Sequence, residues 1–93
     1  MRFEWDVKKA SENFAKHRVT FYEAAEVFYD PNALEEYDLE HSTTEARFVI
    51  IGLSSRRLLF VAFAEYESEV VRIISARKAG AIEREVYEQE AIS

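Results

Sequence analysis

The chain has 93 residues, of which 48% are hydrophobic and 32% charged, and its formal net charge is −6 at pH 7. This length and apolar content predict a single folded domain over residues 1–93 and exclude a disordered chain. Cysteine is absent, which excludes disulfides, thiolate metal ligands and a cysteine nucleophile.

The first 31 residues predict a short strand and two helices. Residues 2–5 are typical of a strand, and Asp6 is a suitable N-cap for a helix over residues 7–17, whose apolar side chains follow helical spacing. A second helix begins after Thr20, which forms a capping box with Glu23 three residues later. Pro31 ends this helix, because the residue before a proline avoids helical geometry.

After Pro31 the apolar pattern alternates, as in strands. Four strands are expected over residues 33–38, 46–53, 58–66 and 69–75, and their short connections predict antiparallel pairing. The third is apolar on both faces and is expected at the centre of the sheet. A last helix follows Gly80, an acceptable N-cap with Glu83 at the third helical position. The fold class is therefore α+β, with two N-terminal helices, a four-stranded antiparallel sheet plus a short N-terminal strand, and a C-terminal helix.

Charge is unevenly distributed along the chain. Residues 19–45 contain eight acidic side chains and no lysine or arginine, so the rest of the chain is net positive. The acidic block is typical of a solvated surface, with contact to a basic partner as the alternative, and a basic face elsewhere stays compatible with a phosphate-bearing ligand. The N-terminus has no apolar signal segment, and the longest apolar run, residues 58–64, is far shorter than the ~20 residues of a membrane helix. We therefore expect a soluble, cytoplasmic protein with no membrane partner.

The catalytic motifs of nucleotide hydrolases, metalloproteases and serine hydrolases are absent. His17 and His41 lie far apart in the sequence with no cysteine nearby, so we expect no metal site, and nothing indicates a cofactor. The remaining polar groups suit RNA cleavage without a metal. That reaction needs a group that removes the 2′-hydroxyl proton, cations that stabilise charge on the phosphate, and a proton donor for the leaving 5′-oxygen.

Two groups of residues are candidates for this chemistry, each with a structural alternative. His17 can carry a proton near neutral pH, but together with Lys16 it also suits a cationic helix end that complements the helix dipole. Arg72 and Arg47 can bind phosphate through their planar guanidinium groups, or they can extend their stems over apolar strand neighbours.

Arg77 and Lys78 lie between the last strand and the C-terminal helix. Such a junction can combine backbone N–H groups with side-chain cations, so it predicts an anion site. Trp5 is expected to anchor the core, and Tyr87 to pack in the core or along a helix face.

Three segments, residues 3–31, 41–54 and 72–88, carry the motifs FEWD, KH-x-V-x-F-x-EA, E-x-RF-x-x-IG-x-S and RIISAR. With these motifs the chain resembles the BrnT family of type II toxins over nearly its whole length. The resemblance implies a RelE-like fold and a metal-independent endoribonuclease that inhibits translation. It also implies neutralisation by a BrnA-like antitoxin that carries the DNA-binding domain and represses the shared operon, so that the toxin meets DNA only through the antitoxin.

Transferred by position, the recurrent polar residues of the family are Asp6, Lys9, Asn13, Lys16, His17, His41, Ser42, Glu45, Arg47, Arg72, Ser75, Arg77, Glu83, Arg84 and Tyr87. The residues expected to take part in catalysis are Arg72, Arg77, His17 and Lys16. Those expected to bind RNA phosphates are Arg47, Lys78, Arg84 and Lys9. The resemblance leaves the general base unassigned.

Two departures from the family pattern bear on function. Members often have glycine where this chain has Arg18, at a helix end that can adopt positive φ. The segment after Ala79 is often richer in arginine than it is here, which weakens the expected hold on RNA. Together with the net charge of −6, this leaves a second hypothesis open: an attenuated or inactive protein that only binds its antitoxin and acts as a co-repressor.

Overall fold

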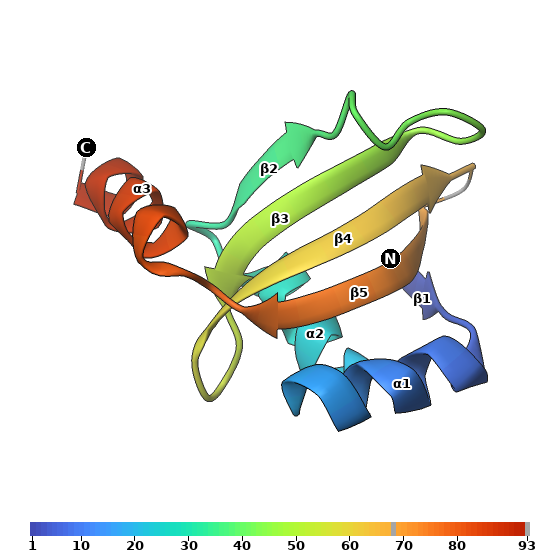
Figure 1. Ribbon diagram of the computed structural model, residues 1–93. Helices are drawn as coiled ribbons and strands as arrows, with labels where there is room; N and C mark the ends of the chain where they lie inside the picture. The colour runs from blue at the N-terminus through green and yellow to red at the C-terminus, as the bar shows by residue number, and fades with distance from the viewer. Residues whose placement is uncertain (68, 93) are drawn as a thin grey trace.

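A five-stranded sheet in the order β1-β5-β4-β3-β2 forms the centre of the computed structural model, which describes residues 1–67 and 69–92 (Figure 1). The strands are β1 (Arg2–Glu4), β2 (Leu34–Tyr37), β3 (Arg47–Leu53), β4 (Leu58–Tyr66) and β5 (Val70–Lys78). The helices are α1 (Val7–His17), α2 (Phe21–Glu26), the 3-10 helix η1 (Val27–Tyr29) and α3 (Ala81–Ile92). In these residues no helix is long and apolar enough to cross a membrane.

The α+β class and the order of the elements are confirmed. Strands β2 to β5 form the expected antiparallel meander, and the apolar strand β4 lies at the centre of the sheet. The sheet differs from the prediction in one respect: β1 pairs with β5 in parallel, so the sheet is five-stranded and mixed. Because β1 has three residues and its partner lies near the other end of the chain, no local pattern indicates this pairing.

Both ends of α1 are fixed by short-range contacts. At its start, Asp6 Oδ1 accepts a hydrogen bond from the Lys9 N–H at 3.0 Å, which confirms the predicted N-cap. At its end, Arg18 adopts a φ of 58° and donates its N–H to the Phe14 carbonyl at 2.9 Å. The helix thus ends in the left-handed conformation that glycine favours, although this conformation costs a residue with a Cβ, such as Arg18, about 1–2 kcal/mol.

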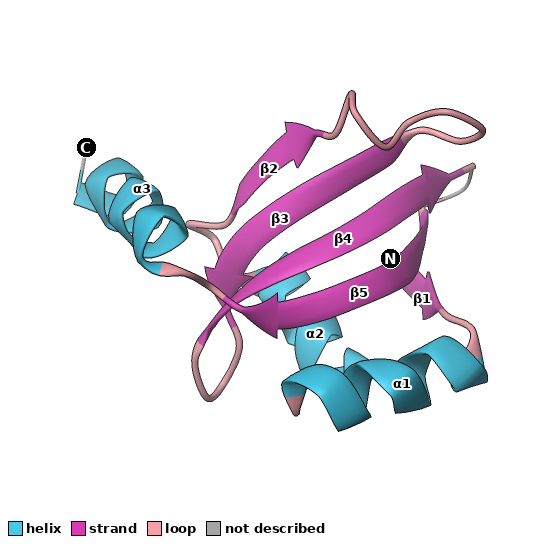
Figure 2. Ribbon diagram, viewed as in Figure 1, coloured by secondary structure: helices cyan, strands magenta, loops and turns pink. Residues whose placement is uncertain are grey.

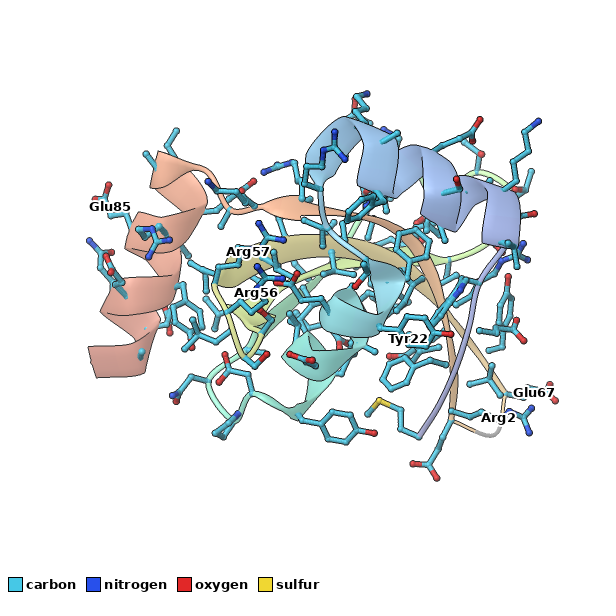
Figure 3. The ribbon with its side chains drawn as sticks, turned by 90° about the horizontal axis from the view of Figure 1, so that it is seen from below. Arg2, Tyr22, Arg56, Arg57, Glu67 and Glu85 are labelled. Atoms are coloured by element: carbon cyan, nitrogen blue, oxygen red, sulfur yellow. The ribbon has the colours of Figure 1, made fainter. Side chains whose placement is uncertain are left out.

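The start of α2 confirms one predicted contact and corrects another. Thr20 Oγ1 accepts a hydrogen bond from the Glu23 N–H at 3.0 Å, as an N-cap does. The Glu23 carboxylate does not complete the capping box, because it accepts hydrogen bonds from Arg57 Nε at 3.0 Å and Nη2 at 2.8 Å. Ser54 Oγ donates to the same carboxylate at 2.7 Å. These contacts attach the turn between β3 and β4 to α2 (Figure 3).

Helices α1, α2 and η1 lie together on one side of the sheet, and the core forms between them and the strands (Figure 2). Gly52 of β3 faces η1, where an added Cβ would lie 2.7 Å from Val27 Cγ1, so this close approach requires glycine. The core residues, none more than 5% exposed, are Val19, Phe21, Ala24, Val27, Ile50, Leu59, Val61, Phe63, Val71, Ile73 and Ala76.

Asn13 connects α1 to the outer edge of β5. Its buried side chain donates from Nδ2 to the carbonyls of Val19 at 3.0 Å and Ala76 at 2.8 Å, and its Oδ1 accepts from the Ala76 N–H at 3.0 Å. The β1 pairing ends before Ala76, so at this residue the Asn13 amide makes the two backbone hydrogen bonds that a neighbouring strand would otherwise make.

A bulge in β5 decides which of its side chains share a face. Residues 62 and 63 of β4 pair with residues 75 and 73 of β5, so Ile74 is an extra residue in that strand. Strict alternation would place Arg72 and Arg77 on opposite faces, because they are an odd number of positions apart. With the bulge, Arg72 pairs with Ala64 and Arg77 with Phe60, which lie on the same face of β4.

Helix α3 begins as predicted and is fixed by a buried tyrosine. The Arg84 N–H donates to the Gly80 carbonyl at 2.9 Å, and the Gly80 N–H donates to Glu83 Oε1 at 2.8 Å, so the expected cap is present. Tyr87 is buried and donates its hydroxyl to Asp30 Oδ2 at 2.7 Å. Burial and this hydrogen bond raise the pKa of Tyr87 to about 12. The contact joins α3 to the segment that precedes β2.

Candidate functional site

The sheet face opposite α1 and α2, which we call the open face, carries the predicted strand arginines. Helix α3 borders this face on the β3 side, where Val86 shares a hollow with Val49 and Ile51. The residues that the pairing register places on the open face of β3, β4 and β5 include Arg47, Val49, Ile51, Phe60, Ala62, Ala64, Arg72, Ser75 and Arg77. The face therefore combines an apolar floor with three arginines.

Two of these arginines lie at one end of the open face with a tyrosine and a glutamate. Arg47 and Arg72 both pair with Ala64 of the strand between them, so their Cα atoms are about 10 Å apart. Tyr66 Oη donates to Glu45 Oε2 at 2.5 Å, and Glu45 Oε1 lies 3.7 Å from Arg47 Nε. The neighbouring Tyr66 hydroxyl is the main cause of a raised pKa of the Arg72 guanidinium. We call Glu45, Arg47, Tyr66 and Arg72 the Arg72 cluster.

The Arg72 cluster is open to solvent. Tyr66 is 38% exposed, and the side chains of Arg47 and Glu45 are 33% and 30% exposed. The hydrogen bond to Glu45 raises the pKa of Tyr66 above its ordinary value of 10.0, so the phenol is protonated at neutral pH. Two guanidinium groups arranged in this way can hold the oxygens of a phosphate group.

Arg77 lies at the other end of the open face and is already paired. Its Nη1 and Nη2 donate to Glu83 Oε1 at 2.8 Å and Oε2 at 2.6 Å, and its guanidinium lies 4.2 Å from the centroid of the Phe60 ring. The hydrogen bonds with Glu83 raise the pKa of Arg77, and the same bonds lower the pKa of Glu83. A carboxylate of the chain thus occupies the position at which the sequence predicts an anion.

Lys78 does not join Arg77 at this junction. It pairs with Leu59, a core residue on the helix side of β4, so the register places Lys78 on the face opposite to Arg77. Arg84 is exposed on α3, one residue beyond Glu83. The sequence predicts Arg77 and Lys78 after the last strand, but both belong to β5 and lie on opposite faces of the sheet, and Arg84 lies on α3.

Two lysines and a histidine lie where α1 meets β5. Lys9, Lys16 and His17 line one shallow hollow together with Ser75. Lys9 and Lys16 are two helical turns apart and share one side of α1, and Glu12 is the acidic residue that lines the same hollow. Because Ser75 also belongs to the open face, the hollow continues that face past the edge of the sheet.

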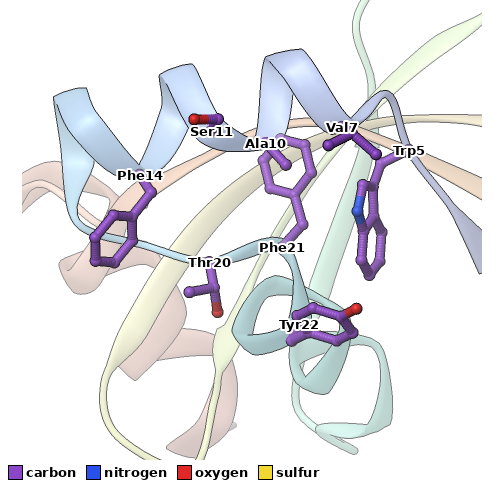
Figure 4. A pocket seen from close by; sticks show the side chains of 8 residues that line it. All are labelled: Trp5, Val7, Ala10, Ser11, Phe14, Thr20, Phe21 and Tyr22. Carbon is purple, nitrogen blue, oxygen red and sulfur yellow. The ribbon is translucent and has the colours of Figure 1, made fainter.

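A hollow on the helix side has a different chemistry. It lies between α1 and the start of α2, and its lining is mostly apolar (Figure 4). Trp5 packs edge-on against Phe21 and Tyr22 there, with ring centroids 5.9 and 4.9 Å apart, which agrees with its expected role as an anchor. Binding of a phosphate chain depends on cations, so the open face is the candidate RNA site. The residues that line the hollow on the helix side are Trp5, Val7, Ala10, Ser11, Phe14, Thr20, Phe21 and Tyr22.

Tyr66 belongs to the site although no sequence motif singles it out. It stands at the end of a strand among acidic residues and looks like an ordinary strand end. Alternation provides the signal: Tyr66 lies two residues from Ala64, the cross-strand partner of Arg72. Among the described residues, no group of three or more His, Asp, Glu or Cys side chains is arranged to hold a metal ion.

The fold and the open face define a small α+β protein with a cationic sheet face suited to phosphate groups. Residues 5–83 match the family described as ribonuclease toxin, BrnT, of type II toxin-antitoxin systems, and the chain therefore belongs to the BrnT family. The family consists of ribonuclease toxins, and a type II system implies an antitoxin as partner. The resemblance inferred from the motifs is confirmed.

A solved structure shares the fold. It is the 1.1 Å crystal structure of the Brucella abortus ribonuclease toxin, BrnT, which is 24% identical to this chain and superposes with a TM-score of 0.61. The match covers 86% of this chain and 97% of that chain. No curated protein sequence matches the chain.

Proposed function

We propose that this protein is a metal-independent endoribonuclease toxin that cleaves RNA on its open face, inhibits translation and is neutralised by a BrnA-like antitoxin. The Arg72 cluster carries the proposal, because it gathers two guanidinium groups, a phenol and a carboxylate on an accessible surface. These are the kinds of group that RNA cleavage needs when no metal takes part. In this proposal the RNA lies along the sheet, as a RelE-like fold implies.

The scissile phosphate binds at the Arg72 cluster. Arg72 and Arg47 approach it from the two strands on either side of Ala64. Their charges stabilise the additional negative charge that forms on the phosphate oxygens during cleavage. Lys16 and His17 line the hollow beside Ser75 and not the cluster itself, so they hold phosphates that flank the cleaved bond.

Arg77 becomes available when Glu83 is displaced. A phosphate can replace the Glu83 carboxylate because both groups accept two parallel N–H donors from a guanidinium. Until this exchange occurs, the pair offers little net charge to RNA.

RNA cleavage by the purified protein in the presence of EDTA tests this function. Wild type is expected to cleave single-stranded RNA and to arrest growth when expressed without antitoxin. Arg72→Ala is expected to reduce the cleavage rate by about 10²-fold or more, as for the loss of a donor that stabilises the transition state. Arg56→Ala is the matched control, since it removes the same charge from an exposed arginine in the turn between β3 and β4 (Figure 3). Intact RNA with wild type, or equal losses in both variants, would contradict the proposal.

The Arg77–Glu83 pair favours a second candidate function. With one of three open-face arginines neutralised and a net charge of −6, the protein would bind its antitoxin, contact DNA only through it and help to repress the operon while cleaving RNA weakly. Expression without antitoxin distinguishes the two functions. Growth arrest supports the toxin, whereas normal growth together with a stable antitoxin complex supports the co-repressor.

A further inference from the structure

We infer that Glu45 is the general base of the RNA cleavage, that its Oε1 atom removes the 2′-hydroxyl proton, and that Tyr66 positions it. The inference rests on the proposed ribonuclease function and assigns the one role that the motifs leave open. Its basis is a carboxylate held among the cations of the Arg72 cluster.

A carboxylate at a phosphate site works against binding. Its charge repels the phosphate and competes for the guanidinium groups of Arg47 and Arg72. The ion pair with Arg47 does not explain its presence, because partly exposed ion pairs contribute little and the 3.7 Å separation of Glu45 Oε1 from Arg47 Nε is too long for a hydrogen bond. A role in the reaction does explain it.

The two oxygens of Glu45 have different surroundings. Oε2 accepts the 2.5 Å hydrogen bond from Tyr66, whose hydroxyl lies beside Arg72. Tyr66 therefore fixes the orientation of the carboxylate without occupying Oε1. Oε1 keeps its lone pairs for a 2′-hydroxyl, at a position next to the guanidinium groups that hold the phosphate.

In the inferred step, the 2′-hydroxyl gives its proton to Glu45 Oε1 while its oxygen forms a bond to phosphorus. The bond between phosphorus and the 5′-oxygen breaks, and the leaving oxygen takes a proton from water. The proton on Glu45 then neutralises the hydroxide that remains. The products are a 2′,3′-cyclic phosphate and a 5′-hydroxyl end.

Glu45→Gln separates the cleavage rate from RNA affinity. Glutamine keeps the shape of the side chain and can still accept the hydrogen bond from Tyr66, but it cannot take up the proton. The single-turnover rate on a single-stranded RNA is expected to fall by about 10²–10⁴-fold. Affinity for the same RNA should stay equal or rise, because a negative charge is removed. Glu40→Gln, the same change at an exposed position five residues earlier, is the control and should alter neither quantity.

Tyr66→Phe keeps the inference testable if Glu45→Gln does not fold. Loss of the hydroxyl frees the Glu45 side chain, so the rate should fall by about 10-fold while affinity changes little. An RNA with a 2′-deoxy nucleotide at the cleaved position should bind and stay intact. Wild-type cleavage rates in folded Glu45→Gln or Tyr66→Phe, with active wild type, would overturn the inference and leave the proposed ribonuclease in place. A wild-type protein that cleaves no RNA would overturn both.

Discussion

Replacing Asn13 with alanine removes the side chain that joins α1 to β5. Three backbone groups then lose a hydrogen-bond partner: the N–H and the carbonyl of Ala76, and the carbonyl of Val19. An unpaired buried group costs about 1–3 kcal/mol, so we assign about 1 kcal/mol to each carbonyl and about 2 kcal/mol to the N–H, which has a single bonding direction. Asn13→Ala should therefore destabilise the fold by about 4 kcal/mol, a large part of the roughly 5–14 kcal/mol expected for a chain of this length.

Urea unfolding followed by tryptophan fluorescence measures this loss. Trp5 is the single tryptophan and packs against Phe21 in the folded protein, so its emission reports unfolding. With a slope of about 1–3 kcal/mol per M urea, a loss of about 4 kcal/mol lowers the midpoint by roughly 1–4 M. Glu12→Ala changes the preceding, exposed residue of the same helix and should stay within about 0.5 kcal/mol of wild type.

Asn13→Asp separates the accepting role of the amide from its donating role. Aspartate can still accept the hydrogen bond from the Ala76 N–H but cannot donate to either carbonyl, and it adds a charge at a buried position. It should destabilise the fold as well, while the Ala76 N–H stays protected from hydrogen exchange. A loss below about 1 kcal/mol in Asn13→Ala would refute the reasoning, since water would then replace the amide at the edge of β5.

Two further predictions concern charged pairs. Glu83→Gln should tighten RNA binding roughly 3- to 10-fold at fixed salt, because Arg77 loses its bidentate carboxylate while the pair is partly exposed. Unchanged affinity in Glu83→Gln and in Arg77→Ala would place the RNA elsewhere. The hydrogen bond from Arg57 lowers the pKa of Glu23 below its ordinary 4.5, so the pair stabilises the fold above that pH, and the contribution is lost as pH falls through the folded-state pKa. Urea midpoints at about pH 6 and pH 3 should therefore differ more in wild type than in Glu23→Gln.

Helix caps were predictable because their chemistry is local. Asp6, Thr20 and Gly80 each form a hydrogen bond with a residue three positions away, and the sequence shows both partners. Glu23 shows the limit of such reasoning. Its carboxylate binds Arg57, which follows 34 positions later and comes near only in the folded chain. This contact replaces the hydrogen bond by which Glu23 would complete the capping box.

The geometry of the site was less predictable than its composition. Motifs point to Arg72 and Arg77, but the extra residue Ile74 decides that both lie on one face, and a bulge leaves no clear signal in an apolar strand. The sequence predicts Glu83 as a helix cap, and this is confirmed. Its second contact, with Arg77, depends on how the chain turns between β5 and α3, which no pattern of apolar residues specifies.

The pairing of the open-face arginines shows how the proposed RNA binding is compatible with an acidic protein. Arg77 and Glu83 form a closed pair in which a phosphate must replace the carboxylate. Glu45 is held by Tyr66 instead, and its contact with Arg47 is longer than a hydrogen bond, so a phosphate can reach Arg47 without expelling the carboxylate. In the proposed function, one end of the face therefore admits RNA by exchange, whereas the other holds a phosphate and a carboxylate together. Removal of a proton beside a bound phosphate requires the second arrangement, which is why we place the reaction at the Arg72 cluster and only binding at Arg77.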